Sequence, residues 1–193
     1  MPASGPHSAR RPLVLYLLLS LAGLALAAQL TALQASAAFP GLCSSADVPG
    51  CDAVAASPYA VLFGVRLSLW GMLGFGALAA LAASGLARER PHGGWPAGLL
   101  FAGAAAAALA SIGLAVLSQA VIGALCLLCA ATWAVSGGLL VLGWRLAREA
   151  GGVRSALRLD LMEARARPQR TAALILTLAG GIAFLMVHAA LRH

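Results

Sequence analysis

Five long apolar runs without charged residues dominate the chain, and short segments that carry the charges separate them. The runs cover residues 13–33, 67–87, 96–117, 121–143 and 171–191. Each is close to the roughly 20 residues that a helix needs to cross about 30 Å of hydrocarbon. The pattern therefore predicts five membrane-spanning helices, the second with a lead-in on the outer side from about residue 57.

Composition strengthens this prediction. Hydrophobic residues make up 61% of the 193 residues and charged residues only 10%, whereas soluble domains carry about 25% charged residues. We therefore expect one all-α integral membrane domain over residues 1–193. The net charge of +7 is interpreted as a topology signal and as contact with membrane lipid, not as nucleic-acid binding.

The positions of the arginines predict the orientation of the spans. Eleven of the thirteen arginines precede the first run, lie between the second and third, or lie between the fourth and fifth. Because positive charges near span ends stay in the cytoplasm, we expect a cytoplasmic N-terminus and a loop at 34–58 that faces the exterior or the periplasm. The first run resembles a signal peptide, but it is longer than a signal core and is expected to be retained.

One cytoplasmic segment, the connector at 145–170, is long enough to hold a further helix. Within it, Val153, Ala156, Leu157, Leu161 and Ala164 recur at helical spacing opposite several arginines. This spacing predicts an amphipathic helix at the membrane surface, held against anionic headgroups.

All four cysteines map to the outer side of this topology. Cys43 and Cys51 lie in the loop 34–58, and Cys126 and Cys129 form a Cys-Leu-Leu-Cys motif early in the fourth run. Thiols gathered in an oxidising compartment favour thiol-disulfide exchange. The spacing of the motif puts both sulfurs on one helix face, where the dipole of a helix N-terminus favours the thiolate.

Simpler interpretations stay open at this point. Cys126 and Cys129 can be packing residues, since cysteine behaves as a small hydrophobe. Cys43 and Cys51 can form a structural disulfide that fastens the loop. Two dithiols on the same side of the membrane favour an electron relay over these simpler interpretations.

These residues resemble the vitamin K epoxide reductase family, including its bacterial quinone-coupled homologues. The resemblance rests on the loop cysteines, on the segment Ser57-Pro-Tyr-Ala-Val-Leu-Phe-Gly64 that enters the second span, and on Cys126-Leu-Leu-Cys129-Ala-Ala-Thr132. It implies a four-helix bundle around a quinone pocket, with the fifth span as an addition. The loop pair precedes the membrane motif, an order that distinguishes this family from DsbB-type oxidases.

The resemblance also implies roles for the cysteines in a disulfide-forming enzyme of the bacterial inner membrane. Cys43 would exchange with a periplasmic thioredoxin-like, DsbA-type partner. Cys51 would pass the electrons to Cys126, and Cys129 would face the quinone, which is ubiquinone or menaquinone. The residues expected to contact the quinone are Ser57, Tyr59, Phe63, Thr132 and Trp133.

Three positions depart from the family pattern. Ala60 stands where the animal enzymes carry asparagine, and Trp133 stands where they carry tyrosine, which argues against vitamin K epoxide as substrate. Arg66 replaces a proline that is typical of bacterial homologues. No fused thioredoxin-like domain follows the fifth span in this sequence, so we expect a separate redox partner.

The sequence leaves two rival functions. A soft-metal transporter of the mercuric type also holds cysteine pairs in a helix and a loop, but no cysteine is expected on the cytoplasmic side here. A structural membrane protein with a stapled loop is the second rival. No histidine has ligand partners at metal-binding spacing, so no resident metal is expected.

Overall fold

The computed structural model describes residues 7–35, 54, 57–87, 96–123, 126–166 and 180–181. The named elements are α1 (His7–Ala35), η1 (Pro58–Ala60), β1 (Val61–Leu62), β2 (Val65–Arg66), α3 (Leu67–Leu86), α4 (Ala97–Leu117), η2 (Ser118–Ile122), α5 (Leu127–Glu149) and α6 (Val153–Ala166). Cys43, Cys51 and nearly all of the expected fifth span at 171–191 lie outside the described residues.

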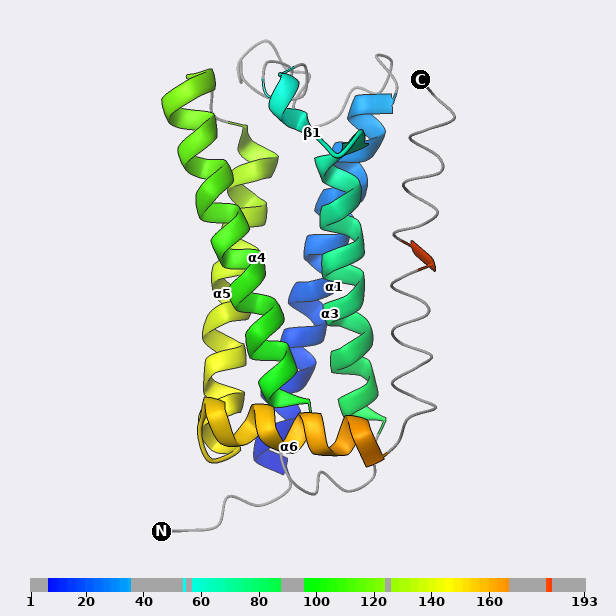
Figure 1. The fold of residues 1–193 in the computed structure, drawn as a ribbon, viewed down its shortest axis with the longest axis vertical. Helices are drawn as coiled ribbons and strands as arrows, with labels where there is room; N and C mark the ends of the chain where they lie inside the picture. The colour runs from blue at the N-terminus through cyan, green and yellow to red at the C-terminus, as the bar shows by residue number, and fades with distance from the viewer. Residues whose placement is uncertain are drawn as a thin grey trace.

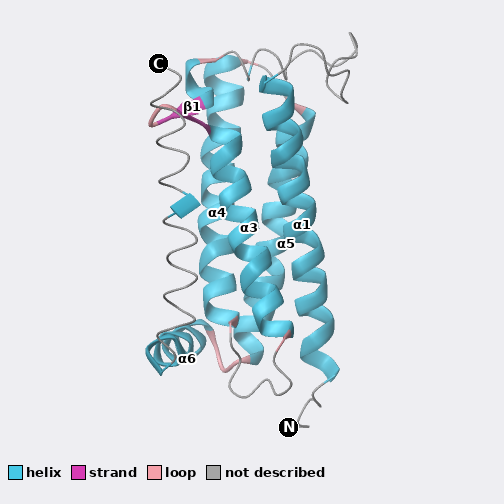
Figure 2. Cartoon of the chain, turned by 90° about the vertical axis from the view of Figure 1, so that its right-hand side faces the viewer, coloured by secondary structure: helices cyan, strands magenta, loops and turns pink. Residues whose placement is uncertain are grey.

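Four helices, α1, α3, α4 and α5, stand side by side as an elongated bundle (Figures 1 and 2). Each is long and apolar enough to cross a membrane, and the spans cover Arg10–Ala32, Leu67–Leu86, Ala97–Val121 and Leu127–Glu149. The expectation of an all-α membrane protein is therefore confirmed for this part of the chain.

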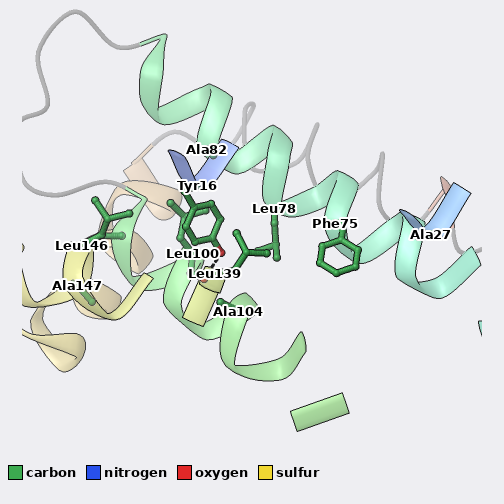
Figure 3. Packing of buried hydrophobic residues seen from close by; sticks show 12 residues of the cluster. Tyr16, Ala27, Phe75, Leu78, Ala82, Leu100, Ala104, Leu139, Leu146 and Ala147 are labelled. Atoms are coloured by element: carbon green, nitrogen blue, oxygen red, sulfur yellow. Dashed lines mark hydrogen bonds between the residues drawn. The ribbon is translucent and has the colours of Figure 1, made fainter. Parts of the chain in front are cut away.

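A continuous core joins the four helices toward the N-terminal end of α1. The hydroxyl of Tyr16, buried on α1, donates to the carbonyl of Leu100 on α4 at 2.8 Å. Leu78 and Leu139 pack into the same cluster, and Figure 3 shows them around the tyrosine ring. Burying the hydroxyl requires this partner, because an unpaired polar group in an apolar interior is costly.

The fourth long helix begins later than its apolar pattern suggests. The chain leaves α4 through the π-helical turn η2, and Gly123 then takes a left-handed conformation with φ of 68°. Helix α5 starts at Leu127 with Cys126 as its N-cap, six residues after the start of the expected run at 121–143. Residues 121 and 122 are apolar but belong to the turn, so hydropathy alone does not mark this boundary.

Helix α6 lies across the end of the bundle that holds the start of α1 (Figure 1). Asp160, fully buried on α6, accepts a hydrogen bond of 2.8 Å from the backbone N–H of Leu99 in the first turn of α4. Gly98 lies so close to the α6 backbone that a Cβ there would be 2.5 Å from the nitrogen of Leu157. Leu161, expected on the apolar face, is 59% exposed because α6 turns Ala156 and Asp160 toward α4.

Candidate redox site and cavity

A cavity of about 520 Å³ lies between the four long helices and extends from the cysteines at the start of α5 to Leu81 on α3 and Gly103 on α4. The wall of the cavity consists of small apolar residues, a few aromatic and aliphatic side chains, several hydroxyl groups and two thiols. The lining residues are Ala27, Leu30, Val54, Ser57, Tyr59, Ala60, Leu67, Ser68, Trp70, Gly71, Gly74, Phe75, Ala77, Leu78, Leu81, Gly103, Ala106, Ala107, Ala110, Ser111, Leu114, Ser118, Cys126, Cys129, Thr132, Trp133 and Ser136. Its volume falls in the range of small-molecule sites.

Small residues on α3 and α4 leave this space open. Gly71 and Gly74 line it from α3, and Ala106 and Ala110 line it from α4. A Cβ built on Gly74 would meet no atom within 4 Å. Part of the run of alanines on α4 therefore forms a wall of the cavity.

Both cysteines of the Cys-Leu-Leu-Cys motif line the cavity as thiols that are not joined in a disulfide. The sulfur of Cys126 accepts a hydrogen bond of 3.3 Å from the backbone N–H of Cys129, so it caps the N-terminus of α5. Cys126 is 1% exposed and Cys129 is half-buried. The motif thus straddles the boundary between the turn and the helix instead of lying well inside the helix.

The position of Cys126 favours its thiolate. Cys126 precedes the span, which begins at Leu127, and its side-chain hydrogen bond with Cys129 lowers the pKa of the Cys126 thiol to about 7. Backbone hydrogen bonds act in the same direction, while burial opposes them. Orphan N–H groups and the dipole at a helix start are the usual cause of such a stabilised thiolate.

Four of the five residues expected around a quinone line the cavity: Ser57, Tyr59, Thr132 and Trp133. Thr132 and Trp133 follow Cys129 by three and four residues, which places them next to it on the same face of α5. Thr132 Oγ1 donates to the carbonyl of Leu128 at 2.6 Å, and Ser57 Oγ donates to the carbonyl of Val54 at 2.8 Å.

Phe63, the fifth expected residue, is not part of the cavity wall. It lies in the turn between β1 and β2 with φ of 54°, and its side chain is 75% exposed. The antiparallel pairing of Val61 with Arg66 turns the chain back on itself here. The hairpin carries Phe63 away from the wall that Tyr59 and Ala60 form, and the sequence signal for this turn is Gly64, which has φ of 76°.

The three residues that depart from the family pattern all lie among the described residues. Ala60 and Trp133 both line the cavity, so each changes its wall directly. Arg66 is half-buried at the N-cap of α3. Just inside that helix, Trp70 Nε1 donates to the carbonyl of Leu62 at 3.3 Å and ties the hairpin to α3.

Sequence reasoning missed a group of hydroxyls in the cavity. Ser68, Ser111, Ser118 and Ser136 line it in addition to Ser57. Ser136 follows Cys129 by seven residues, two helical turns, and this spacing was a usable signal. Ser111 lies on α4 and Ser118 begins η2, so no spacing within α5 connects them to the cysteines. Among the described residues, no group of three or more His, Cys, Asp or Glu side chains has the arrangement of a metal site.

The chain was compared with known families, curated proteins and solved structures. The model of the vitamin K epoxide reductase family matches residues 14–144. This range includes both cysteines of α5 and every residue that lines the cavity. No curated protein and no solved structure matches the chain.

Proposed function

Because the chain belongs to the vitamin K epoxide reductase family, we propose that it oxidises dithiols and passes their electrons to a membrane quinone. Membership of this family makes the chain a membrane oxidoreductase that acts on thiols. One observation carries the quinone proposal: the dithiol of Cys126 and Cys129 lines an apolar cavity of about 520 Å³.

The residues around the cavity suit a quinone. Such a ligand needs an apolar enclosure for its ring and a small number of hydrogen-bonding groups for its oxygens. The small residues of α3 and α4 supply the enclosure, while Ser57 and Thr132 supply hydroxyls close to the cysteines. Tyr59 and Trp133 supply flat walls. When bound, the quinone accepts two electrons and two protons and leaves as a quinol.

Electrons and protons balance in the proposed reaction. The two thiols of Cys126 and Cys129 lose two electrons and two protons and form one S–S bond. A dithiol delivered from the loop then reduces this bond again by thiol-disulfide exchange. Cys129 is assigned to the quinone because it lies on the cavity face of α5. Cys126, whose thiolate is favoured at the helix start, is assigned to exchange with the loop.

The part of the electron relay that involves Cys43 and Cys51 is inferred from the sequence. We propose that Cys43 exchanges with a periplasmic thioredoxin-like protein of the DsbA type. Cys51 then forms a transient bridge to Cys126. Val54, three residues after Cys51, packs against the buried cluster of Cys126 and Leu128, which is the described contact nearest to this step.

The cellular location and the domain organisation complete the proposal. We propose that the protein lies in a bacterial inner membrane with the cysteine end of the bundle in the periplasm. Residues 1–193 form a single domain, with the loop at 34–58 and the connector at 145–170. A fifth span covers 171–191. Gly181 supports this span, because a Cβ there would be 2.9 Å from Leu73 Cδ1 on α3. The quinone is ubiquinone or menaquinone. Neither the described residues nor the comparisons favour a soft-metal transporter.

Quinone reduction by the purified full chain in detergent tests the proposal. The protein is supplied with a reduced thioredoxin-like dithiol, and the wild type is compared with Cys129→Ser and Cys43→Ser. Leu127→Ser, an exposed position between the two cysteines of α5, is the matched control. We expect reduction by the wild type and the control, and none by Cys129→Ser.

The Cys43→Ser variant tests the order of the relay. Its activity should return when a small membrane-permeant thiol replaces the protein partner, because such a thiol bypasses the loop. A wild type that oxidises no dithiol in the presence of quinone would overturn the proposal, and binding of a soft metal through the same thiols would then favour the transporter.

A further inference from the structure

Two serines form a hydrogen-bonded pair inside the cavity, away from the cysteines. Ser111 Oγ on α4 donates to Ser136 Oγ on α5 at 3.0 Å. Ser136 Oγ in turn donates to the carbonyl of Thr132 at 2.9 Å. Both serines line the cavity. Ser136 is 1% exposed, and Ser111 is half-buried.

The bonding of Ser111 differs from that of other helical serines in this chain. Ser20 donates to the carbonyl of Tyr16, and Ser84 donates to that of Leu81, each within its own helix. This is the ordinary way in which a serine satisfies its hydroxyl inside an apolar helix. Ser111 instead reaches across to a neighbouring helix, at a place where both partners face a cavity.

The pair lies at a defined distance from the redox cysteines. Ser136 follows Cys129 by seven residues on α5, which is two turns and about 10.5 Å along the helix axis. The lining residues Thr132 and Trp133 lie between them on the same face. The cavity therefore has a thiol at one level and a pair of hydroxyls about two turns deeper, with apolar wall from α3 and α4 around both.

We propose that the Ser111–Ser136 pair is a second polar anchor of the cavity. It binds one carbonyl oxygen of a para-quinone, the one that lies farther from Cys129. This inference rests on the proposed function. A reactive contact of about 3 Å, a ring whose two oxygens are about 5 Å apart, and a hydrogen bond of about 2.8 Å together span about 11 Å. That length is close to the roughly 10.5 Å that separates the level of Cys129 from that of Ser136 along α5, and Ser111 Oγ lies 3.0 Å from Ser136 Oγ.

The two serines have different roles in this arrangement. Ser111 is the binding residue, because its hydroxyl can turn its hydrogen from Ser136 to a ligand oxygen. Ser136 is a positioning residue: its own hydrogen stays on the carbonyl of Thr132, and its oxygen orients the Ser111 hydroxyl in the cavity until a ligand oxygen takes over that hydrogen. After reduction, the same Ser111 oxygen can accept a hydrogen bond from the hydroxyl of the quinol. No proton is gained or lost by the pair.

Ligand binding to the oxidised full chain in detergent, whose cysteines are joined in disulfides and cannot reduce the quinone or add to it, tests the proposal without depending on turnover. Quenching of Trp70 and Trp133, which line the cavity, reports the Kd of 1,4-naphthoquinone. Naphthalene, which has the same ring system without oxygens, is measured by its displacement of the naphthoquinone. The variants are Ser111→Ala, Ser136→Ala and Ser111→Thr, and Ser84→Ala on α3 is the matched control, because Ser84 is not among the cavity-lining residues.

We expect Ser111→Ala to raise the Kd for naphthoquinone about two- to tenfold, which corresponds to one neutral hydrogen bond. Naphthalene binding should not change, since it has no oxygen to lose. Ser136→Ala should show a smaller loss in the same direction, and Ser111→Thr should restore wild-type affinity. Equal changes for both ligands would show that the pair only shapes the cavity and would overturn the inference.

The test separates the inference from the proposed function. A wild type that binds and reduces naphthoquinone, together with a Ser111→Ala variant of unchanged affinity, overturns the anchor and leaves the function standing. A wild type that binds no naphthoquinone overturns both.

Discussion

The sulfur of Cys126 holds the place that a serine or aspartate oxygen occupies at many helix starts. It accepts the backbone N–H of Cys129, and its pKa is lowered to about 7 chiefly by its side-chain hydrogen bond with Cys129. An ordinary thiol has a pKa of about 8.5. Cys126 is therefore about half thiolate near neutral pH, where an unperturbed thiol is almost fully protonated.

This lowered pKa predicts the pH profile of the reduced protein. The ultraviolet absorbance of the Cys126 thiolate, taken as wild type minus Cys126→Ser, should rise with a midpoint near pH 7. In Cys129→Ala the side-chain hydrogen bond is lost, so the midpoint should move up toward 8.5. A wild-type midpoint at or above that value would contradict the assignment.

Gly74 allows a second prediction for a single residue. Its absent side chain faces the cavity, and a Cβ there meets nothing within 4 Å. Gly74→Leu should therefore fill the cavity without strain and reduce quinone turnover at least about tenfold, a loss of about 1.4 kcal/mol or more. Gly76→Leu is the control, because a Cβ there also has free space and Gly76 is not among the lining residues. Equal activity in both variants would exclude the cavity as the site of reduction.

Helix α6 is joined to the bundle by contacts that substitutions can test. Gly98→Ala puts a Cβ 2.5 Å from the Leu157 nitrogen, and backbone atoms cannot rotate away. Asp160→Ala removes the acceptor for the N–H of Leu99. Each should destabilise the protein by about 1–3 kcal/mol, seen as a lower Tm in detergent. Gly113→Ala, elsewhere on α4 with free space around it, should not lower the Tm.

The sequence predicts helical elements well where hydropathy changes sharply. The expected runs 67–87 and 96–117 agree with α3 and α4 to within a residue at each end, because charges or polar turns bound them. The start of α5 was missed because the turn before it is apolar, and its signal is backbone geometry at Gly123. Thr132 and Trp133 were predictable from their spacing to Cys129. Ser111 was not, because its partnership with Ser136 exists only once two helices pack.

At the scale of the whole molecule, the dithiol and most of the arginines of the described residues lie at opposite ends. Cys126 is at the end of the bundle where α5 begins, and α6 with exposed Arg154, Arg158 and Arg165 lies across the other end. Arginines near span ends stay in the cytoplasm. The proposed orientation, with thiol exchange outside, therefore places the arginines of α6 at the inner headgroups.

This orientation predicts which engineered thiols react in intact cells. In a chain with its four cysteines replaced by serine, Gln119→Cys places a thiol on the exposed turn η2, and Ser155→Cys places one on the exposed side of α6. A maleimide that cannot cross the membrane should label residue 119 in intact cells, and residue 155 only after the membrane is permeabilised. The two sites lie at opposite ends of the same bundle, so each is the control for the other. The reverse pattern would put Cys126 in the reducing cytoplasm, where a disulfide-forming relay would work against the thiol pool.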